Sequence, residues 1–312
     1  MVKSKNIKVI TLTVNPAIDV HIRLDELLSG FDNLGRIERR DLGGKGVNVS
    51  RALISLGLDS LCFVVAGEEN GINFLEGLRE QGLKVDYCLV NGAVRENINM
   101  HTRNGDTVVA TEGPLLGKED IELLSLKLLP HIQENTILVF SGRIAEGSDK
   151  EGIIDMLLRA QEKGAALILD SRSLTAGDVS KLSPLMIKPN LEEAEHILGH
   201  KIDNPISAAG ELATLGADYV ILTLGKEGLV LSDGKKEVFC PSVEVEVNST
   251  VGAGDSTVAS FIYSQINGFS FAETAMHAVA TSAAACLTKG TLPPQACEIN
   301  RLFEQIKSTS QT

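Results

Sequence analysis

The sequence predicts an α/β protein built on a mostly parallel β-sheet that is flanked by helices. Short apolar segments rich in β-branched residues alternate along the chain with segments of helical periodicity. The apolar segments are continuous and do not alternate with polar residues, which is typical of strands that are buried on both faces. No Pro-rich or Ser-rich linker interrupts the 312 residues, so we expect one domain spanning residues 1–312.

The order of these segments fits right-handed crossovers between parallel strands. We predict strands at Lys8–Val14, Ser60–Ala66, Thr136–Phe140, Ala166–Asp170, Leu185–Lys188 and Tyr219–Thr223. The predicted helices between them include Gly46–Leu56, Phe74–Gln81, Lys150–Lys163, Asn190–Leu198 and Ile206–Leu215.

Two stretches, Val20–Leu42 and Asp86–Thr111, break this rhythm. Polar and apolar residues alternate from Asn97 to Thr102, which favours antiparallel strands with one solvated face. We therefore predict a small β-sheet inserted into the main domain, formed by residues 20–42 and 86–111. A peripheral sheet without a functional role is the alternative.

The last third of the chain begins with a predicted hairpin. Leu229–Leu231 and Glu237–Phe239 flank Asp233 and Gly234, a pair that favours a tight turn. Two helices are then expected, at Ser256–Gly268 and Phe271–Lys289. The second is rich in alanine, which allows it to pack closely against its neighbours.

Composition excludes several classes of partner. The net charge of −12 disfavours nonspecific binding to nucleic acid or to an anionic membrane. No apolar run is long enough to span a bilayer, and the N-terminus leads into a strand and not into a signal peptide, so we expect a soluble, cytoplasmic protein. The 5 cysteines show no C-x-x-C spacing and are expected to be free thiols. His196 and His200 flank Gly199, which indicates a helix end more than a metal site.

A small-residue loop near the C-terminus predicts an anion site. Gly252, Ala253 and Gly254 lead into a helix, so their backbone N–H groups can converge on one anion at the positive end of the helix dipole. Asp255 follows, where a carboxylate could take a proton from a hydroxyl that attacks a phosphate. A plain helix N-cap would use the same residue types.

A second loop of this kind lies near the N-terminus. Gly43, Gly44, Lys45 and Gly46 open a helix and combine a flexible turn with a mobile cation. Two such loops at opposite ends of the chain indicate two anionic groups that are brought to a common cleft.

Four motifs in order carry a family resemblance. They are Asn15-Pro16-Ala17-Ile18-Asp19, the Gly43-Gly44-Lys45-Gly46-Val47-Asn48 loop, Lys188-Pro189-Asn190-Leu191-Glu192-Glu193, and Gly252-Ala253-Gly254-Asp255. From about residue 7 to about residue 305 the chain resembles the ribokinase-like (PfkB) carbohydrate kinases. Within that family the motifs are most similar to those of the bacterial hexose-phosphate kinases, 1-phosphofructokinase and tagatose-6-phosphate kinase.

The resemblance implies a role for each motif. Asp255 is then the catalytic base, and Gly252, Ala253 and Gly254 form the anion hole. The implied sugar-phosphate site contains Asp19, Gly43, Gly44, Lys45, Asn48, Arg95 and Ser141. The implied ATP site contains Lys188, Asn190, Thr223, Gly225 and Gly228, while Glu193 acts on Mg²⁺ through water. From local sequence alone, Asn190 and Glu193 also fit a capping box.

The resemblance also implies ATP and Mg²⁺ as cofactors, with a monovalent cation such as K⁺ as a further candidate. The small sheet is then a lid over the sugar site and the contact surface of a homodimer. One segment departs from the family pattern. Ser141-Gly142-Arg143-Ile144-Ala145 stands where these phosphofructokinases usually have Ser-Gly-Ser-Leu-Pro, which leaves the role of Arg143 open between phosphate binding, altered substrate preference and solvent exposure.

The expected activity is ATP-dependent phosphorylation of a ketohexose phosphate. Conversion of fructose 1-phosphate to fructose 1,6-bisphosphate ranks ahead of tagatose-6-phosphate kinase and 6-phosphofructokinase activity. A nucleotide-binding regulatory protein without turnover is disfavoured by the intact Asp255 and its glycines. A kinase for unphosphorylated sugars is disfavoured by Arg95.

Overall fold

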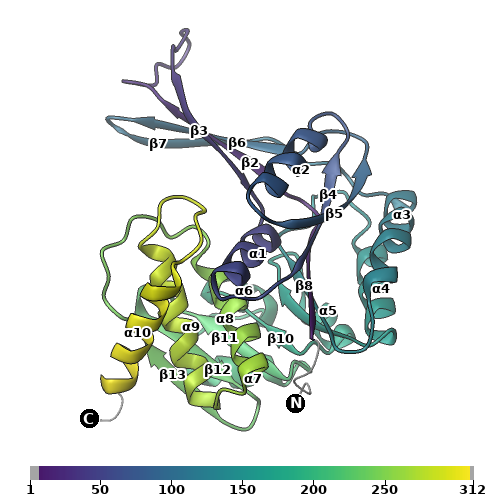
Figure 1. The fold of residues 1–312 in the computed structure, drawn as a ribbon, viewed down its shortest axis with the longest axis vertical. Helices are drawn as coiled ribbons and strands as arrows, with labels where there is room; N and C mark the ends of the chain where they lie inside the picture. The colour runs from purple at the N-terminus through teal and green to yellow at the C-terminus, as the bar shows by residue number, and fades with distance from the viewer. Residues whose placement is uncertain (1–6, 310–312) are drawn as a thin grey trace.

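A large twisted sheet with helices on both faces dominates the computed structural model, which describes residues 7–309 (Figure 1). Its nine strands follow the order β13-β12-β11-β10-β9-β8-β1-β4-β5. Neighbours from β11 to β5 run parallel, and β12 and β13 add an antiparallel hairpin at one edge. The strands are β1 (Lys8–Thr13), β4 (Leu61–Gly67), β5 (Lys84–Val90), β8 (Thr136–Ser141), β9 (Ala165–Asp170), β10 (Met186–Ile187), β11 (Tyr219–Thr223), β12 (Gly228–Ser232) and β13 (Glu237–Pro241).

Helices cover each face of this sheet. One face carries α3 (Lys118–Leu128), α4 (Lys150–Glu162), α5 (Ala176–Leu182), α6 (Leu191–Leu198) and α7 (Pro205–Ala213). The other carries α1 (Lys45–Ser55), α2 (Gly71–Glu80), α8 (Ala253–Asn267), α9 (Phe271–Cys286) and α10 (Ala296–Thr309). Short 3₁₀ helices occupy Leu129–His131 and Gly225–Glu227.

Successive side chains of the central strands pack into the hydrophobic cores on opposite faces of the sheet. Val9 and Ile137 pack with the α8–α9 layer, whereas Ile10 and Leu138, one residue further along, pack with the α3–α4 layer. Each of these four side chains is buried. This two-sided burial explains why the strands read as continuous apolar runs and confirms the predicted α/β class.

Local capping chemistry places the start of α6. The side chain of Asn190 accepts a hydrogen bond from the backbone N–H of Glu193, and the Glu193 carboxylate accepts one from the N–H of Asn190. This is the capping box that the sequence indicated. The helix ends at Gly199, which has a φ of 77°, so the helix terminus expected between His196 and His200 is confirmed.

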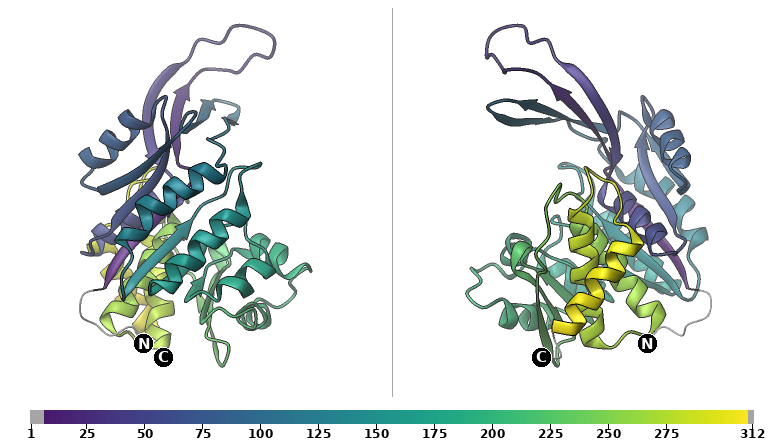
Figure 2. Two further views of the ribbon diagram at one scale, coloured as in Figure 1. Left: turned by 90° about the vertical axis from the view of Figure 1, so that its right-hand side faces the viewer. Right: turned by 60° about the vertical axis from the view of Figure 1, so that its left-hand side comes forward.

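A second, four-stranded sheet projects from the main body (Figure 2). Its order is β3-β2-β6-β7, formed by β2 (Ala17–Arg23), β3 (Arg36–Gly43), β6 (Arg95–Thr102) and β7 (Gly105–Ala110). Ile18 and Val20 on one side pack with α2 and β4. The opposite side carries polar residues in register, with Asp19 opposite both Asp41 and Asn97.

The predicted boundaries of this small sheet were partly wrong. The expected segment 86–111 includes most of β5, but β5 pairs with β4 in the large sheet, where Phe63 is opposite Asp86. The second segment of the small sheet therefore begins at Arg95. The first begins at Ala17 and not at Val20. Strand β5 is only partly buried because it is the edge strand of the large sheet, so its sequence resembles that of a strand with one solvated face.

The described helices differ from the predicted ones mainly at their ends. Helix α8 begins at Ala253, three residues before the predicted Ser256, so Asp255 lies inside the first helical turn. All 5 cysteines are free, and Cys62, Cys88 and Cys240 are buried. Among the described residues, no helix is long and apolar enough to cross a membrane.

Candidate active site

The N-terminus of α8 forms the floor of the site. Gly252 precedes the helix with a φ of 80°, a left-handed conformation that glycine adopts without strain. The N–H of Ala253 donates to the carbonyl oxygen of Thr250 at 3.4 Å. The N–H groups of Gly254 and Asp255 have no acceptor within the helix, so they are available to an anion. Asp255 is 6% exposed in this turn. A Cβ at Gly254 would lie 3.2 Å from the Nζ of Lys188, so this ammonium lies directly against the loop.

A buried carboxylate that the sequence analysis did not single out lies beside these groups. Asp170 ends β9 and is 1% exposed. Its Oδ1 lies 2.9 Å from the Nζ of Lys45 and 3.2 Å from the Nζ of Lys188. Lys45 begins α1 and Lys188 follows β10, so one carboxylate links three segments that are distant in sequence. The Nζ of Lys45 is also 3.6 Å from Oε1 of Glu193.

The charges around Asp170 and Asp255 move their pKa values in opposite directions. Burial alone would raise the pKa of Asp170, but the two lysines outweigh it and hold that pKa below its ordinary value. Burial and the negative charge of Asp170 raise the pKa of Asp255 to about 6, against the opposing effects of Lys45 and Asn48. Burial would also lower the pKa of Lys45, but Asp170 and Glu193 raise it, so the ammonium stays charged. The two lysines thus favour the ionised form of Asp170, and Asp255 is a stronger base than a free aspartate.

Asn48 and Arg51 orient the Asp255 carboxylate from one turn of α1. The Nδ2 of Asn48 donates to Oδ2 of Asp255 at 2.9 Å, and Nη1 of Arg51 donates to Oδ1 of Asn48 at 2.8 Å. The Nε of Arg51 donates to Gln81 at the end of α2. The amide of Asn48 thus contacts Asp255 and Arg51, and its place in the sugar-phosphate site stays a prediction.

The small sheet brings a second polar group to the site. The Nδ2 of Asn97 donates to Oδ1 of Asp19 at 2.7 Å, and Nη1 of Arg95 donates to Oδ1 of Asn97 at 2.9 Å. Gly43 lies against this group, since a Cβ there would be 3.4 Å from Oδ2 of Asp19. Gly44 has a φ of 134° and leaves no room for a Cβ, which would come within 2.8 Å of the Thr13 side chain.

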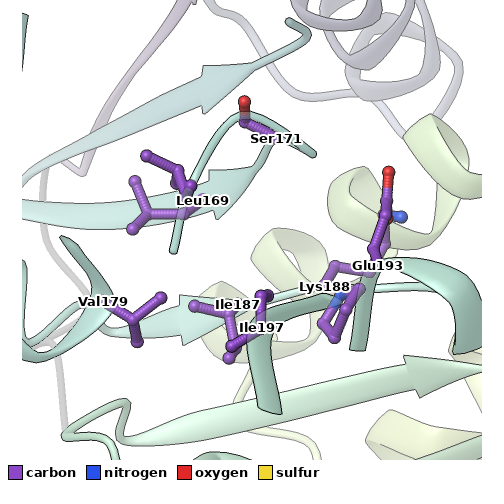
Figure 3. Close-up of a pocket in the computed structure, with 9 residues that line it drawn as sticks. Leu169, Ser171, Val179, Ile187, Lys188, Glu193 and Ile197 are labelled. Atoms are coloured by element: carbon purple, nitrogen blue, oxygen red, sulfur yellow. The ribbon is translucent and has the colours of Figure 1, made fainter. Parts of the chain in front are cut away.

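A cavity of about 530 Å³ opens on the other side of the α8 N-terminus. Its lining includes the predicted nucleotide residues Asn190, Thr223, Gly225 and Gly228, together with residues of α8 and α9. Lys188 does not line it. Figure 3 shows Lys188 and Glu193 close together beside apolar side chains at the ends of β9 and β10. The hollow among them has about 10 Å³, which is room for one water at most.

Comparison with known protein families identifies the family of this chain. The model of the pfkB family carbohydrate kinases matches residues 9–296. The chain belongs to the pfkB family of carbohydrate kinases.

Curated relatives of this kinase cover nearly its whole length. A 1-phosphofructokinase of Borreliella burgdorferi is 30% identical over 95% of this chain and 94% of its own length. A tagatose-6-phosphate kinase of Staphylococcus epidermidis is 29% identical over 80% of this chain and 83% of its own. Among solved structures, phosphofructokinase-2 of Escherichia coli in complex with substrates and products has a TM-score of 0.86, at 24% identity over 96% of this chain and 100% of that one. This last likeness shows the ribokinase-like fold.

The structure of the kinase gathers the predicted residues into two groups. Asp255, Asn48, Lys45, Lys188 and Glu193 lie together around Asp170. Asp19, Gly43 and Arg95 meet on the polar side of the small sheet. Lys45 contacts Asp170 and Glu193, and its place beside Arg95 in the sugar-phosphate site stays a prediction. Ser141 is fully buried and is opposite Asp170 in the β8–β9 pairing, and its Oγ has no hydrogen-bond partner within residues 7–309.

Three functional candidates were not identified from the sequence: Asp170, Arg51 and Arg172, the last of which follows β9 and lines a cavity of about 400 Å³. Asp170 had a usable signal, because ligand sites of α/β sheets lie at the carboxyl ends of strands and Asp170 ends a predicted one. Arg51 and Arg172 had none, since an isolated arginine on a helix or loop is usually solvated.

We expect the Asp170 carboxylate to stabilise the fold through its two lysines. Asp170→Asn removes the charge and leaves Lys188, which is 4% exposed, without a counter-ion. Such a change should lower the free energy of unfolding by about 3–5 kcal/mol. Urea denaturation measures this free energy, and its dependence on urea concentration is compared between variants to verify that the unfolding transition is the same.

Asp155→Asn is the matched control, because Asp155 pairs with Lys181 at 3.0 Å on the surface with its side chain 64% exposed. Surface pairs contribute about 0–1 kcal/mol, so the control should change stability by no more than that. Equal losses in the two variants would contradict the role of Asp170.

Proposed function

We propose that this kinase transfers the γ-phosphoryl group of ATP to the 6-hydroxyl of fructose 1-phosphate, which gives fructose 1,6-bisphosphate and ADP. The observation that carries the proposal is the pair of buried aspartates at the α8 N-terminus, one neutralised by two lysines and the other with a raised pKa. Phosphoryl transfer requires a site that offsets negative charge beside a single proton acceptor. The 1-phosphofructokinases among its relatives support this choice of substrate.

In the proposed reaction, a carboxylate oxygen of Asp255 accepts the proton of the 6-hydroxyl as the hydroxyl oxygen forms its bond to the γ-phosphorus. The bond from that phosphorus to the bridging oxygen breaks, and the electron pair leaves with ADP. The N–H groups of Gly252, Ala253 and Gly254 face the group in transit, where backbone donors cost no reorganisation. Lys45 and Lys188 add positive charge from the Asp170 side.

The cavity of about 530 Å³ is large enough for a nucleotide, and it meets the α8 N-terminus at Ala253 and Gly254. Asn190 and Thr223 are among its lining residues. Glu193 is the proposed contact to Mg²⁺ through water, and bound Mg²⁺ would offset the phosphate charge. No cluster of three potential metal ligands occurs in residues 7–309, which fits an ion held largely by phosphates and water.

The K⁺ requirement stays a prediction. A phosphofructokinase-2 of Escherichia coli has been solved in complex with potassium, at 24% identity and a TM-score of 0.88.

A second candidate substrate is tagatose 6-phosphate. It is favoured by the tagatose-6-phosphate kinases of Staphylococcus epidermidis, which are 29% identical to this chain. Both substrates are ketohexose monophosphates, so both need a phosphate site beside a site for sugar hydroxyls. Asp19, held by Asn97, can accept hydrogen bonds from hydroxyls of either sugar.

Asp255→Asn should lower kcat by roughly two or more orders of magnitude, because the amide cannot accept the hydroxyl proton. ATP binding should persist in the variant. In the wild type, kcat/KM should fall as the pH drops through about 6, since Asp255 acts only when deprotonated. Steady-state kinetics from pH 5 to 8 measure both effects, and turnover of the variant within a few-fold of the wild type would refute the assignment.

The second ionisation of a phosphate ester also occurs near pH 6, so a further variant is needed. The hydrogen bond from Asn48 lowers the pKa of Asp255. Asn48→Ala should therefore move the acidic limb of the profile to higher pH, whereas substrate ionisation would leave the limb where it was. An unmoved limb would assign it to the substrate.

Arg95→Ala tests the substrate class. The KM for fructose 1-phosphate should rise about tenfold to a hundredfold, the loss expected for a charge-assisted contact, while the KM for ATP changes little. Wild type and variant are compared on fructose 1-phosphate, tagatose 6-phosphate, fructose 6-phosphate and free fructose by ADP release. The wild type should prefer fructose 1-phosphate, and the variant should lose its preference for phosphorylated sugars. A KM increase confined to ATP would place Arg95 on the nucleotide side.

We further propose that the small sheet is a lid and the contact surface of a homodimer. Every residue of β7 is exposed, and the loop between β2 and β3 carries Phe31 at 75% and Leu34 at 97% exposure. Val108 and Val109 add exposed apolar surface on β7. Such a concentration of apolar side chains on a projecting sheet is typical of a protein–protein interface.

The purified kinase should be a dimer by light scattering at assay concentrations. Phe31→Asp combined with Leu34→Asp should shift it toward monomer and lower its activity, because lid closure over the sugar would lose its support. Leu126→Asp, at a residue of α3 that is 72% exposed, is the control and should leave the dimer intact. A fully active wild-type monomer would exclude the proposal.

A further inference from the structure

Three arginines gather on the sugar side of the site without a carboxylate partner. Arg95 begins β6 of the small sheet, Arg143 follows β8, and Arg172 follows β9. Within residues 7–309, none of the three forms an ion pair, and Arg95 has a side-chain hydrogen bond only to Asn97. In a chain with a net charge of −12, three unpaired neighbouring cations require a physical reason.

Arg143 and Arg172 are placed close together because they follow the ends of two adjacent strands, β8 and β9. The strands are neighbours in the large sheet, and the backbone N–H of Ile144 donates to Oγ of Ser173 at 3.0 Å. Arg143 and Arg172 each stand next to one of these bonded residues. Both line a single cavity of about 400 Å³. Glu146, Glu192 and Glu193 also line it, together with Asn190 of the predicted nucleotide site, but none of these glutamates forms an ion pair with either arginine.

Buried donors in this cluster lack acceptors. The Nε atoms of Arg95 and Arg143 are buried and have no hydrogen-bond partner in the described part of the chain. Burial and the charge of Arg143 lower the pKa of Arg95, and Arg172 acts in the same direction against the opposing charge of Asp19. Unsatisfied buried donors and mutual repulsion both cost free energy, and an anion bound among the guanidinium groups would remove both costs.

We propose that Arg143 and Arg172 act with Arg95 as a three-arginine clamp for the phosphate group that the sugar substrate already carries, and that they determine the preference of this kinase for phosphorylated sugars. Planar guanidinium groups bind phosphate oxygens through paired hydrogen bonds, which point charges such as lysine do not provide. The clamp also gives a role to Arg143, where the sequence departs from the family pattern. This inference rests on the proposed function and extends it to two residues.

The test compares Arg143→Ser and Arg172→Ser with the wild type. Each should raise the KM for fructose 1-phosphate about tenfold or more, with the KM for ATP within about twofold. The double variant should lose most of the discrimination between fructose 1-phosphate and free fructose. Arg143→Lys and Arg172→Lys should also raise KM, because they keep the charge but lose the planar fork.

Arg159→Ser is the matched control, since Arg159 is an exposed arginine of α4 outside the cavity. It should leave every kinetic constant unchanged. Thermal unfolding of each variant verifies that the fold is retained. If Arg159→Ser raises the KM for fructose 1-phosphate as much as the clamp variants do, the effect is due to overall charge and the clamp is refuted.

Binding without ATP separates this inference from the proposed function. Calorimetry with fructose 1-phosphate, tagatose 6-phosphate and inorganic phosphate should show affinity that falls in both serine variants. If the wild type turns over fructose 1-phosphate but both variants bind and use it as the wild type does, the clamp is wrong and the proposed function stands. If the wild type does not turn it over, yet phosphate binding depends on both arginines, the clamp stands and the proposed substrate is wrong.

Discussion

The buried carboxylate of Asp170 is the group on which the arrangement of the site depends. It lies at the carboxyl end of β9, where it can be ionised only if cations approach it closely. Lys45 lies at the start of α1 and Lys188 directly after β10, and the Nζ atoms of both contact Oδ1 of Asp170. This requirement fixes the relative positions of the glycine-rich loop before α1 and the strand that leads to α6. Lys188 in turn lies against Gly254 and so fixes the N-terminus of α8.

The same charge also determines the chemistry of its neighbour. Asp255 shares the buried environment, but among the described residues its side chain has a hydrogen bond only from the amide of Asn48, so its carboxylate is held less strongly in the ionised form. Two neighbouring buried aspartates thereby differ in pKa, which is the basis for proposing Asp255 as the proton acceptor. Arg51 and Gln81 extend the support of Asn48 to α2, which packs beneath the small sheet. The small sheet and Asp255 are therefore connected through a continuous series of hydrogen bonds and packed side chains.

Cations of two kinds lie near the candidate site of this acidic chain. The net charge of −12 sets the long-range field, but local geometry controls binding at short range. Lys45 and Lys188 are paired with Asp170. Within residues 7–309, Arg95 and Arg143 have no carboxylate partner, and their buried Nε atoms have no hydrogen-bond partner. This difference is the basis on which we propose a phosphate clamp at the arginines and not at the lysines.

The sequence by itself determined the α/β class, the alternating strands and helices, the helix that starts at the Gly252 loop and the capping box at Asn190. These features depend on periodicity, on turn residues and on contacts within four residues, all of which are local. It also identified Asp255 through its motif and Arg95 through the family resemblance. Only the tertiary structure decided that β5 belongs to the large sheet, that Asp170 joins Lys45 to Lys188, and that Arg172 lies beside Arg143. These contacts depend on which strand ends become neighbours after the crossovers, and no local sequence pattern indicates which strands pair.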